Sequence, residues 1–256
     1  MDTNKKRRAL IKYHHGMGDV IQLMPHLRLL YNMGYITDIM GMSQNRTSHL
    51  LDACPYTDKL IDIPNTWKSP LGFSRQLTVD MERFENLRKD YDWSGFANHV
   101  GIGSTDKIDY TSMELGLEVV DKTVEVFISN EIEAVALAFI KTNFPDGYIF
   151  VHTMIEEHTY HNWDAGGWIS ENLPNLPIIN TGYDGNFFMC HEDINFSFVL
   201  AREATHRIMS SSVMVHACDA MGSTVDVVNY GRPDRKIWLS DMSKVLRIRE
   251  AGKFIK

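Results

Sequence analysis

The residues best suited to chemistry stand in one short run, His14-His15-Gly16-Met17-Gly18-Asp19. Asp19 carries a carboxylate, which takes the proton of a substrate hydroxyl when it lies within hydrogen-bond reach. A Gly-x-Gly spacing lets the backbone approach a ligand closely, because glycine has no Cβ and adopts positive φ angles. We therefore assign Asp19 as the reactive group and His14, His15, Gly16, Met17 and Gly18 as residues that line a cleft. A lone Gly-x-Gly is equally consistent with an ordinary turn before a helix that Asp19 caps.

The elements around this run decide where it lies in a fold. Residues 9–13 form a short apolar stretch that predicts a buried strand, and residues 20–31 have the apolar spacing of an amphipathic helix. Asp19 then stands at the start of the helix, where the helix dipole favours a carboxylate. In a parallel α/β sheet this edge is where ligands bind.

Alternating strands and helices continue through the first half of the chain. The pattern predicts strands at 36–40 and 60–64, an edge strand at 123–128, and helices at 45–53, 77–89, 108–117 and 131–142. Residues 65–75 are predicted to form a loop. Strands that alternate with helices in this way indicate parallel strands joined by crossovers.

Phe144-Pro145-Asp146-Gly147 is the clearest break in the chain, and the alternation of strands and helices resumes after it. Strands are predicted at 148–151, 177–180 and 225–230, and helices at 165–173, 195–209, 213–221 and 241–250, the last packing back on the first half. We expect an α/β protein with two Rossmann-like domains, residues 1–144 and 145–256, that face each other across a cleft.

Composition narrows the class of protein. The 256 residues are 44% hydrophobic and 23% charged, as in globular proteins, and no apolar run is long enough to cross a membrane. The basic start leads into a short apolar run rather than a signal peptide, and three scattered cysteines lack a Cys-x-x-Cys pair. A cytoplasmic protein is expected. The net charge of −7 argues against a general nucleic-acid coat.

Several short motifs follow one another in an order that resembles one enzyme family. They are Gly16-Met17-Gly18-Asp19-Val20 with Met24-Pro25-His26-Leu27, then Asp58-Lys59-Leu60-Ile61-Asp62, His152-Thr153 with Asn162-Trp163, and Ser212-Val213-Met214-Val215-His216-Ala217 before Ala220-Met221-Gly222. In this order and spacing the chain resembles the heptosyltransferase-like glycosyltransferases of family 9. The motifs span nearly the whole chain.

The resemblance implies a GT-B fold, with an N-terminal acceptor domain and a C-terminal nucleotide-sugar domain. It also implies an inverting, metal-independent transfer in which Asp19 is the general base and the nucleotide-sugar is a co-substrate, with no further cofactor. Backbone N–H groups at a helix N-terminus stabilise a leaving diphosphate without metal. On this basis the donor-binding residues are Thr153, His161, Gly182, Ser211, Ser212 and His216.

The chain departs from the family pattern in its second half. Ser211-Ser212-Val213 stands where the family usually has Asp-Ser/Thr-Gly, and His161 stands where the family has a lysine. These differences leave the donor nucleotide and sugar open. The pair His158 and His161 would hold a metal on a helix, although a solvated loop over the donor site is the favoured reading.

We expect a glycosyltransferase that moves a sugar from a nucleotide diphosphate to a hydroxyl. The acceptor is left open between a glycan, such as a lipopolysaccharide core sugar, and a hydroxymethylated pyrimidine in DNA. A non-catalytic nucleotide- or sugar-binding protein of the same fold is the alternative from another class. A nucleotide-sugar epimerase is disfavoured, since the third glycine of a dinucleotide fingerprint is missing.

Overall fold

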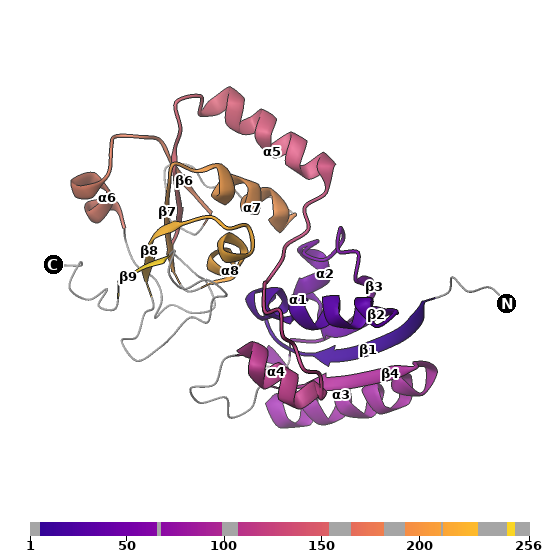
Figure 1. The fold of residues 1–256 in the computed structure, drawn as a ribbon. Helices are drawn as coiled ribbons and strands as arrows, with labels where there is room; N and C mark the ends of the chain where they lie inside the picture. Colours follow the sequence, from indigo (N-terminus) through magenta and orange to yellow (C-terminus); the bar gives the residue numbers. More distant parts are fainter. Residues whose placement is uncertain are drawn as a thin grey trace. The chain divides into compact units, whose positions relative to one another are not determined.

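A computed structural model describes residues 6–65, 68–98, 107–153, 165–181, 193–210, 212–229 and 245–248. The chain divides into two compact units, Met1–Phe127 and Ile128–Lys256. Within the described residues each unit has its own sheet, of four strands in the first and five in the second (Figure 1). All the strand pairs in both sheets are parallel. The α/β class with two parallel sheets is thereby confirmed.

The first unit is a half of a Rossmann-type sheet, with the strand order β3-β2-β1-β4. Its strands are β1 (Arg7–Tyr13), β2 (Tyr35–Met42), β3 (Thr57–Ile63) and β4 (Trp93–Ala97). Its helices are α1 (Met17–Asn32), α2 (Gln44–Thr47), α3 (Phe73–Leu87), the 3-10 turn η2 (Arg88–Asp90) and α4 (Lys107–Leu115).

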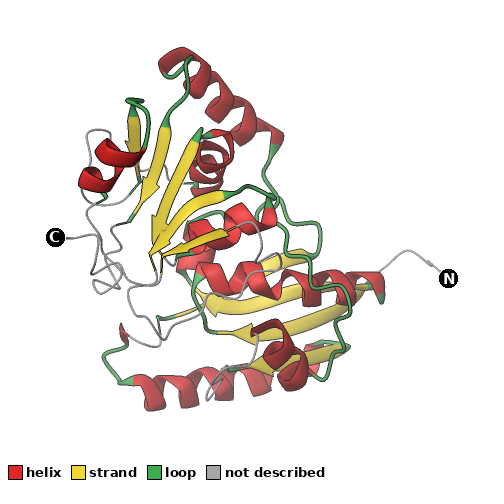
Figure 2. Ribbon diagram, turned by 60° about the vertical axis from the view of Figure 1, so that its left-hand side comes forward, coloured by secondary structure: helices red, strands yellow, loops and turns green. Residues whose placement is uncertain are grey.

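The period of two along β1 sends its side chains to opposite faces of this sheet. Leu10 packs in a buried cluster with Met40 and with Phe84 of α3. Tyr13 is fully buried and its hydroxyl donates to the backbone carbonyl of Asp19 in α1 at 3.0 Å. The helices α3 and α1 accordingly cover opposite faces of the sheet, as Figure 2 shows. Because both faces are covered, β1 is apolar along most of its length.

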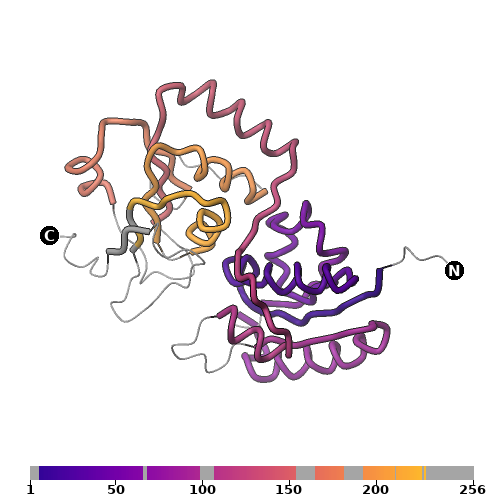
Figure 3. Tube along the Cα trace, in the orientation of Figure 1, coloured from indigo at the N-terminus to yellow at the C-terminus, as the bar shows by residue number. Residues whose placement is uncertain are grey.

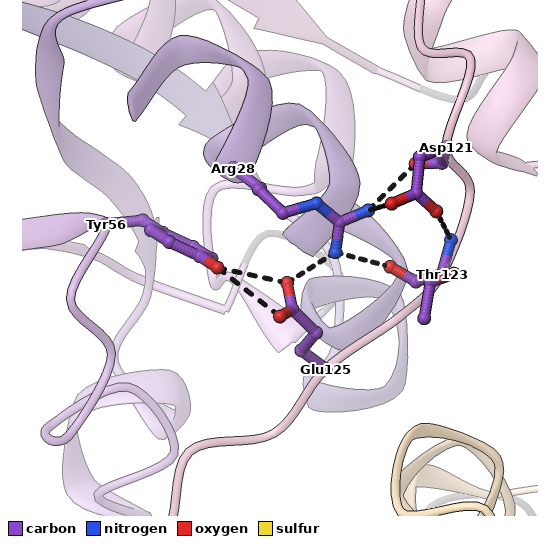
Figure 4. A network of polar contacts seen from close by, with 5 residues as sticks. All are labelled: Arg28, Tyr56, Asp121, Thr123 and Glu125. Atoms are coloured by element: carbon purple, nitrogen blue, oxygen red, sulfur yellow. Dashed lines mark hydrogen bonds and ion pairs between the residues drawn. The ribbon is translucent and has the colours of Figure 1, made fainter. Parts of the chain in front are cut away.

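A stretch without helix or strand, residues 116–129, connects α4 to the next helix (Figure 3). The guanidinium of Arg28 in α1 holds its first part. It donates to the carbonyl of Thr123 at 3.0 Å and to the carboxylate of Glu125 at 2.5 Å, and it also contacts Asp121 (Figure 4). Tyr56 donates to the same Glu125 carboxylate at 3.2 Å. Side-chain contacts therefore fix this segment, and strand pairing does not.

The second unit carries the strand order β6-β5-β7-β8-β9, the other common order of doubly wound sheets. Its strands are β5 (Ile149–His152), β6 (Ile178–Asn180), β7 (His206–Ser210), β8 (Val225–Asn229) and β9 (Val245–Ile248). Its helices are α5 (Asn130–Asn143), α6 (Gly166–Asn172), α7 (Ile194–Glu203) and α8 (Val213–Ala220).

Side chains on both faces of β5 are buried. Ile149 and Val151 cluster with Ile169 of α6 on one face. On the other face the Tyr148 hydroxyl, just before β5, donates to the carbonyl of Leu200 in α7 at 2.6 Å. This arrangement explains why residues 148–151 are apolar without alternation.

The division between the units falls earlier than the predicted boundary at residue 144. The reason is the packing of α5, which lies against α7 of the second unit. The rings of Phe139 and Phe196 are 5.8 Å apart, and Arg202 pairs with Glu133 at 2.6 Å. A helix that precedes the Phe144–Gly147 break thus belongs with the sheet that follows it.

Several predicted elements were wrong. Strand β4 was not predicted, and residues 123–128 do not form the predicted edge strand. The helix predicted at 195–209 ends at Glu203, and β7 follows because residues 206–210 pair with β5. The helix predicted at 241–250 is wrong where the structure describes it, since residues 245–248 are strand β9, which pairs with β8. The helix predicted at 45–53 is only the short α2.

Among the helices that the structure describes, none combines the length and the apolar character that a membrane span requires.

Candidate active site

The strand order places the Asp19 run at a point where ligands bind in α/β sheets. The chain builds β1, β2 and β3 outward in one direction and then returns to place β4 on the other side of β1. Ligand sites of such sheets lie beyond the carboxyl ends of the strands where the direction changes. A ring nitrogen of His15, just after β1, forms a 3.0 Å hydrogen bond with the carbonyl of Asn98, just after β4. The predicted run lies at this edge.

The glycines of the run do not form the expected turn with positive φ. Helix α1 begins at Met17 instead of Val20, so Gly18 is helical and Gly16 is the N-cap, with φ −69°. A Cβ on Gly16 would meet the Gln44 amide nitrogen at 3.7 Å, which is ordinary contact. Neither backbone strain nor close packing requires Gly16.

Asp19 is the third residue of α1 and not its cap. Its carboxylate forms an ion pair with Lys107, the first residue of α4. The side chains keep 20% exposure at Asp19 and 30% at Lys107, so the pair is only partly covered. Lys107 was not predicted from the sequence, because it lies 88 residues after Asp19 and belongs to no motif. Asp19 thus has both a favourable position at a helix N-terminus and a cationic neighbour.

The two histidines of the run differ in their surroundings. Their rings stack at 4.5 Å between centroids. His14 is fully buried, with the ring of Phe73 at 6.3 Å and that of Phe96 at 6.1 Å, whereas His15 is partly exposed. Of the two, His15 has the surface that a ligand at this edge would meet.

A buried lysine lies close to the run and was not singled out from the sequence. Lys12 of β1 is fully buried, with its ammonium 4.6 Å from the centre of the Phe96 ring. It has no hydrogen-bond partner among the described residues. Burial lowers the pKa of Lys12 to about 8, and the carboxylate of Asp80 in α3 partly offsets this effect. Asp80 is itself buried and accepts from Gln76 at 2.8 Å.

The second sheet has its own change of direction, between β5 and β7. Ser210 at the end of β7 donates to the carbonyl of Thr153, just after β5, at 3.1 Å. His152 is hydrogen-bonded to the Thr181 hydroxyl at 2.9 Å, and burial lowers the pKa of His152 to about 4. The imidazole of His152 is therefore neutral at pH 7. Thr153, a predicted donor-binding residue, is buried at this edge.

Helix α8 begins at Val213, three residues after the end of β7, in agreement with the helix predicted for residues 213–221. Ser212 is its N-cap, and the Ser212 hydroxyl accepts from the backbone N–H of Met214 at 3.3 Å. His216 lies one turn into this helix and is partly exposed. Thr153, Ser212 and the start of α8 thus belong to one edge of the second sheet.

Three predicted donor-binding residues, His161, Gly182 and Ser211, lie outside the described residues. The same holds for His158, with which His161 was considered as a metal ligand. Within the described part of the chain, no group of three or more His, Cys, Asp or Glu side chains has a geometry that would hold a metal ion.

Comparison with known proteins gives similarity at the level of structure alone. No family model matches the chain, and no curated protein matches it. A glycosyl transferase of family 9 from Veillonella parvula superposes with a TM-score of 0.61 at 12% identity, over 94% of this chain and 86% of the other. E. coli ADP-heptose lps heptosyltransferase II superposes with a TM-score of 0.57 at 13% identity, over 94% of this chain and 90% of the other.

The E. coli heptosyltransferase WaaC, in a structure with ADP, also gives a TM-score of 0.57, at 12% identity, over 97% of this chain and 98% of that one. These matches cover both units and both sheets. The likeness in fold that the order of motifs predicted is confirmed. The chain has the fold of the heptosyltransferase-like glycosyltransferases of family 9.

Proposed function

We propose that this protein is a glycosyltransferase that moves a sugar from a nucleotide-diphosphate donor to a hydroxyl of an acceptor. The observation that carries the proposal is the position of Asp19, a partly exposed carboxylate at the edge of the first sheet where the strand direction changes. The fold is that of enzymes named as heptosyltransferases. Fold alone does not imply activity, so the proposal depends on this carboxylate.

In the proposed reaction, Asp19 takes the proton of the acceptor hydroxyl as its oxygen attacks the anomeric carbon, with inversion there. The bond from that carbon to the diphosphate breaks, and the nucleoside diphosphate leaves with the bonding electrons. The first unit is the acceptor half in this scheme. His15, just after β1, and the first turn of α1, which contains Asp19, are the residues proposed for the acceptor side.

The donor half is the second unit, with Thr153 and the start of α8 as the place for the diphosphate. The first N–H groups of a helix have no partner within the helix, and they suit an anion without a metal. The Ser212 hydroxyl already accepts from Met214, so its own O–H remains able to donate to a phosphate oxygen. His216 one turn further along α8 completes this proposed set, together with His161, Gly182 and Ser211.

The first donor and acceptor to test follow from the neighbours' names. One neighbour is named for ADP-heptose and lipopolysaccharide, and WaaC has been solved with ADP-2-deoxy-2-fluoro heptose. We therefore propose an ADP-linked sugar as the first donor and a lipopolysaccharide core sugar as the first acceptor. No feature of the described residues favours a DNA base as the acceptor.

The test is to compare wild type with Asp19→Asn, which keeps the shape of the side chain and removes the proton acceptor. Sugar transfer should fall by about a hundredfold to ten-thousandfold, the usual contribution of a general base. Affinity for ADP, measured by calorimetry, should stay the same, because the proposed donor residues lie on other elements. Asp52→Asn is the matched control, since Asp52 is exposed and pairs with His49.

Transfer by Asp19→Asn within a few fold of wild type would remove Asp19 from the mechanism. A wild-type protein that binds nucleotide and transfers no sugar with any donor and acceptor tried would instead favour the alternative, a non-catalytic binding protein of this fold.

A further inference from the structure

Lys107 is the charged side chain that the structure places against the proposed base. We propose that Lys107 is a positioning residue for Asp19: its ammonium keeps the carboxylate ionised and oriented before the acceptor hydroxyl arrives. This inference rests on the proposed function, since it assigns Asp19 the role of base. It concerns a residue outside every motif that led to the family resemblance.

The two partners of the pair stand on elements that are fixed to each other. Asp19 is in the first turn of α1, and Lys107 is the first residue of α4. A ring nitrogen of His26 in α1 is hydrogen-bonded to Ser112 of α4 at 3.0 Å, and His26 is fully buried. A site on two packed helices is held more precisely than one on loops. The pair is therefore built into the packing of α1 on α4.

The Asp19–Lys107 pair is more covered than the Asp109–Lys122 pair of the same unit. Its side chains are 20% and 30% exposed, whereas Asp109 and Lys122 are 48% and 41% exposed. An ion pair between well-exposed side chains contributes little, because water screens the charges. A cation beside a partly covered carboxylate favours its ionised form.

Several other ionisable groups that the structure describes on the elements around Asp19 have partners of their own. Tyr13 donates to the backbone carbonyl of Asp19, not to its carboxylate, and burial raises the pKa of Tyr13 well above its usual value. Further groups on these elements and their partners include His15 with the carbonyl of Asn98, Glu114 with the N–H of Asn98, Asp109 with Lys122, Arg46 with Asp62, His26 with Ser112, and Arg28 with Glu125. Lys107 is the cation that contacts the Asp19 carboxylate among the described side chains.

The chemical step limits what Lys107 can contribute. The proton of the acceptor hydroxyl passes to a carboxylate oxygen of Asp19, and Lys107 keeps its own protons throughout. A neutral Asp19 is attracted less strongly to the ammonium than the carboxylate was, so the pair does not stabilise the product of proton transfer. Its contribution is made beforehand, by keeping the carboxylate ionised and in one orientation.

The ion pair can be tested without any substrate. Protein with ¹³C-labelled aspartate carboxyls is titrated by NMR as wild type and as Lys107→Met, with Asp19→Asn to assign the signal. The midpoint for Asp19 should rise by about one pH unit in Lys107→Met, as expected when an opposite charge is removed. An unchanged midpoint overturns the proposal, whatever the activity of the protein.

The same variants are then compared in the transfer assay. In Lys107→Met, kcat on the pH plateau should fall about tenfold through loss of orientation, and the acid limb of the pH profile should move up by about one unit. The KM for the donor should stay the same, and Lys107→Arg should restore most of kcat because it keeps the charge. A plateau kcat equal to or above that of wild type, or an unmoved acid limb, overturns the positioning role.

Lys122→Met is the matched control, since it removes an exposed cation close to the same helix and should leave the midpoint for Asp19 where it is. A shifted midpoint in Lys107→Met together with a wild type that transfers no sugar would support the ion pair and contradict the proposed function. The two claims therefore fail separately.

Discussion

The Arg28 network offers the sharpest test of how the first unit holds the segment that leads out of it. We consider Arg28→Met, which keeps much of the aliphatic stem and removes the guanidinium. The change deletes the bonds to the carbonyls of Asp121 and Thr123 and the pairs with the carboxylates of Asp121 and Glu125 (Figure 4). These bonds connect α1 with this segment and with no other element.

The expected loss of folding stability in Arg28→Met follows from the exposure of each partner of Arg28. Arg28 is 17% exposed and Glu125 29%, whereas Asp121 is 67% exposed and its carboxylate contributes little. A hydrogen bond to a charged group contributes about 1.5 kcal/mol at the low end of the usual range, which suits a partly exposed site. The Glu125 pair and the Thr123 carbonyl bond together give about 2–3 kcal/mol.

The assay is urea denaturation, with hydrogen exchange by mass spectrometry on residues 116–127 to localise the effect. Arg28→Met should lower the free energy of unfolding by about 2–3 kcal/mol and speed exchange in that segment. Arg46→Met is the control, because Arg46 pairs with Asp62 at 55% and 37% exposure and should change stability by less than about 0.5 kcal/mol.

A double-mutant cycle with Glu125→Gln then isolates the pair itself, with a coupling of about 1 kcal/mol expected. A coupling of zero within error, or equal losses for Arg28→Met and Arg46→Met, would refute the reasoning from exposure.

Two further predictions concern buried titratable groups. The pKa of Lys12 is about 8 in the folded protein against 10.5 ordinarily, so the unfolded chain binds more protons between these values and the free energy of unfolding should rise with pH there. Urea denaturation from pH 7 to 10 should show a smaller rise in Lys12→Met, and an equal rise in both proteins would contradict burial of the charge. The pKa of His152 is about 4 against 6.5, so its contribution to stability is complete above about pH 6.5 and is lost as the pH falls toward 4. NMR of the imidazole should give a midpoint well below 6, and a midpoint near 6.5 would show that His152 is hydrated.

Local pattern in the sequence was sufficient for the core elements of both units. Residues 148–151 are an unbroken apolar run, and residues 9–13 are apolar apart from Lys12; each run lies in an interior strand of its sheet. The helix after Asp19 and the helix after Ser212 were also predicted, to within a few residues at their starts. The spacing of apolar residues within a segment indicates which face of that segment is buried, so these elements can be predicted from short stretches of sequence.

Short strands with few apolar residues could not be predicted in this way. Strand β4 contains Ser94 and Gly95, and β7 begins with His206 and Arg207, so neither has a continuous apolar run. They are strands because β1 and β5 offer an open edge to pair with. Strand propensity depends on the neighbouring strand more than on the segment itself.

The sequence by itself determined that a buried strand precedes the Asp19 run and that a helix begins close to Asp19, and that a second α/β unit follows the first. Only the tertiary structure decided that α5 belongs to the second unit, that β4 lies beside β1, and that Lys107 meets Asp19. The physical reason is the range of each interaction. Burial of a strand or a helix face is set by spacing over a few residues, whereas the ion pair between α1 and α4 joins residues that are 88 positions apart and depends on how the two helices pack.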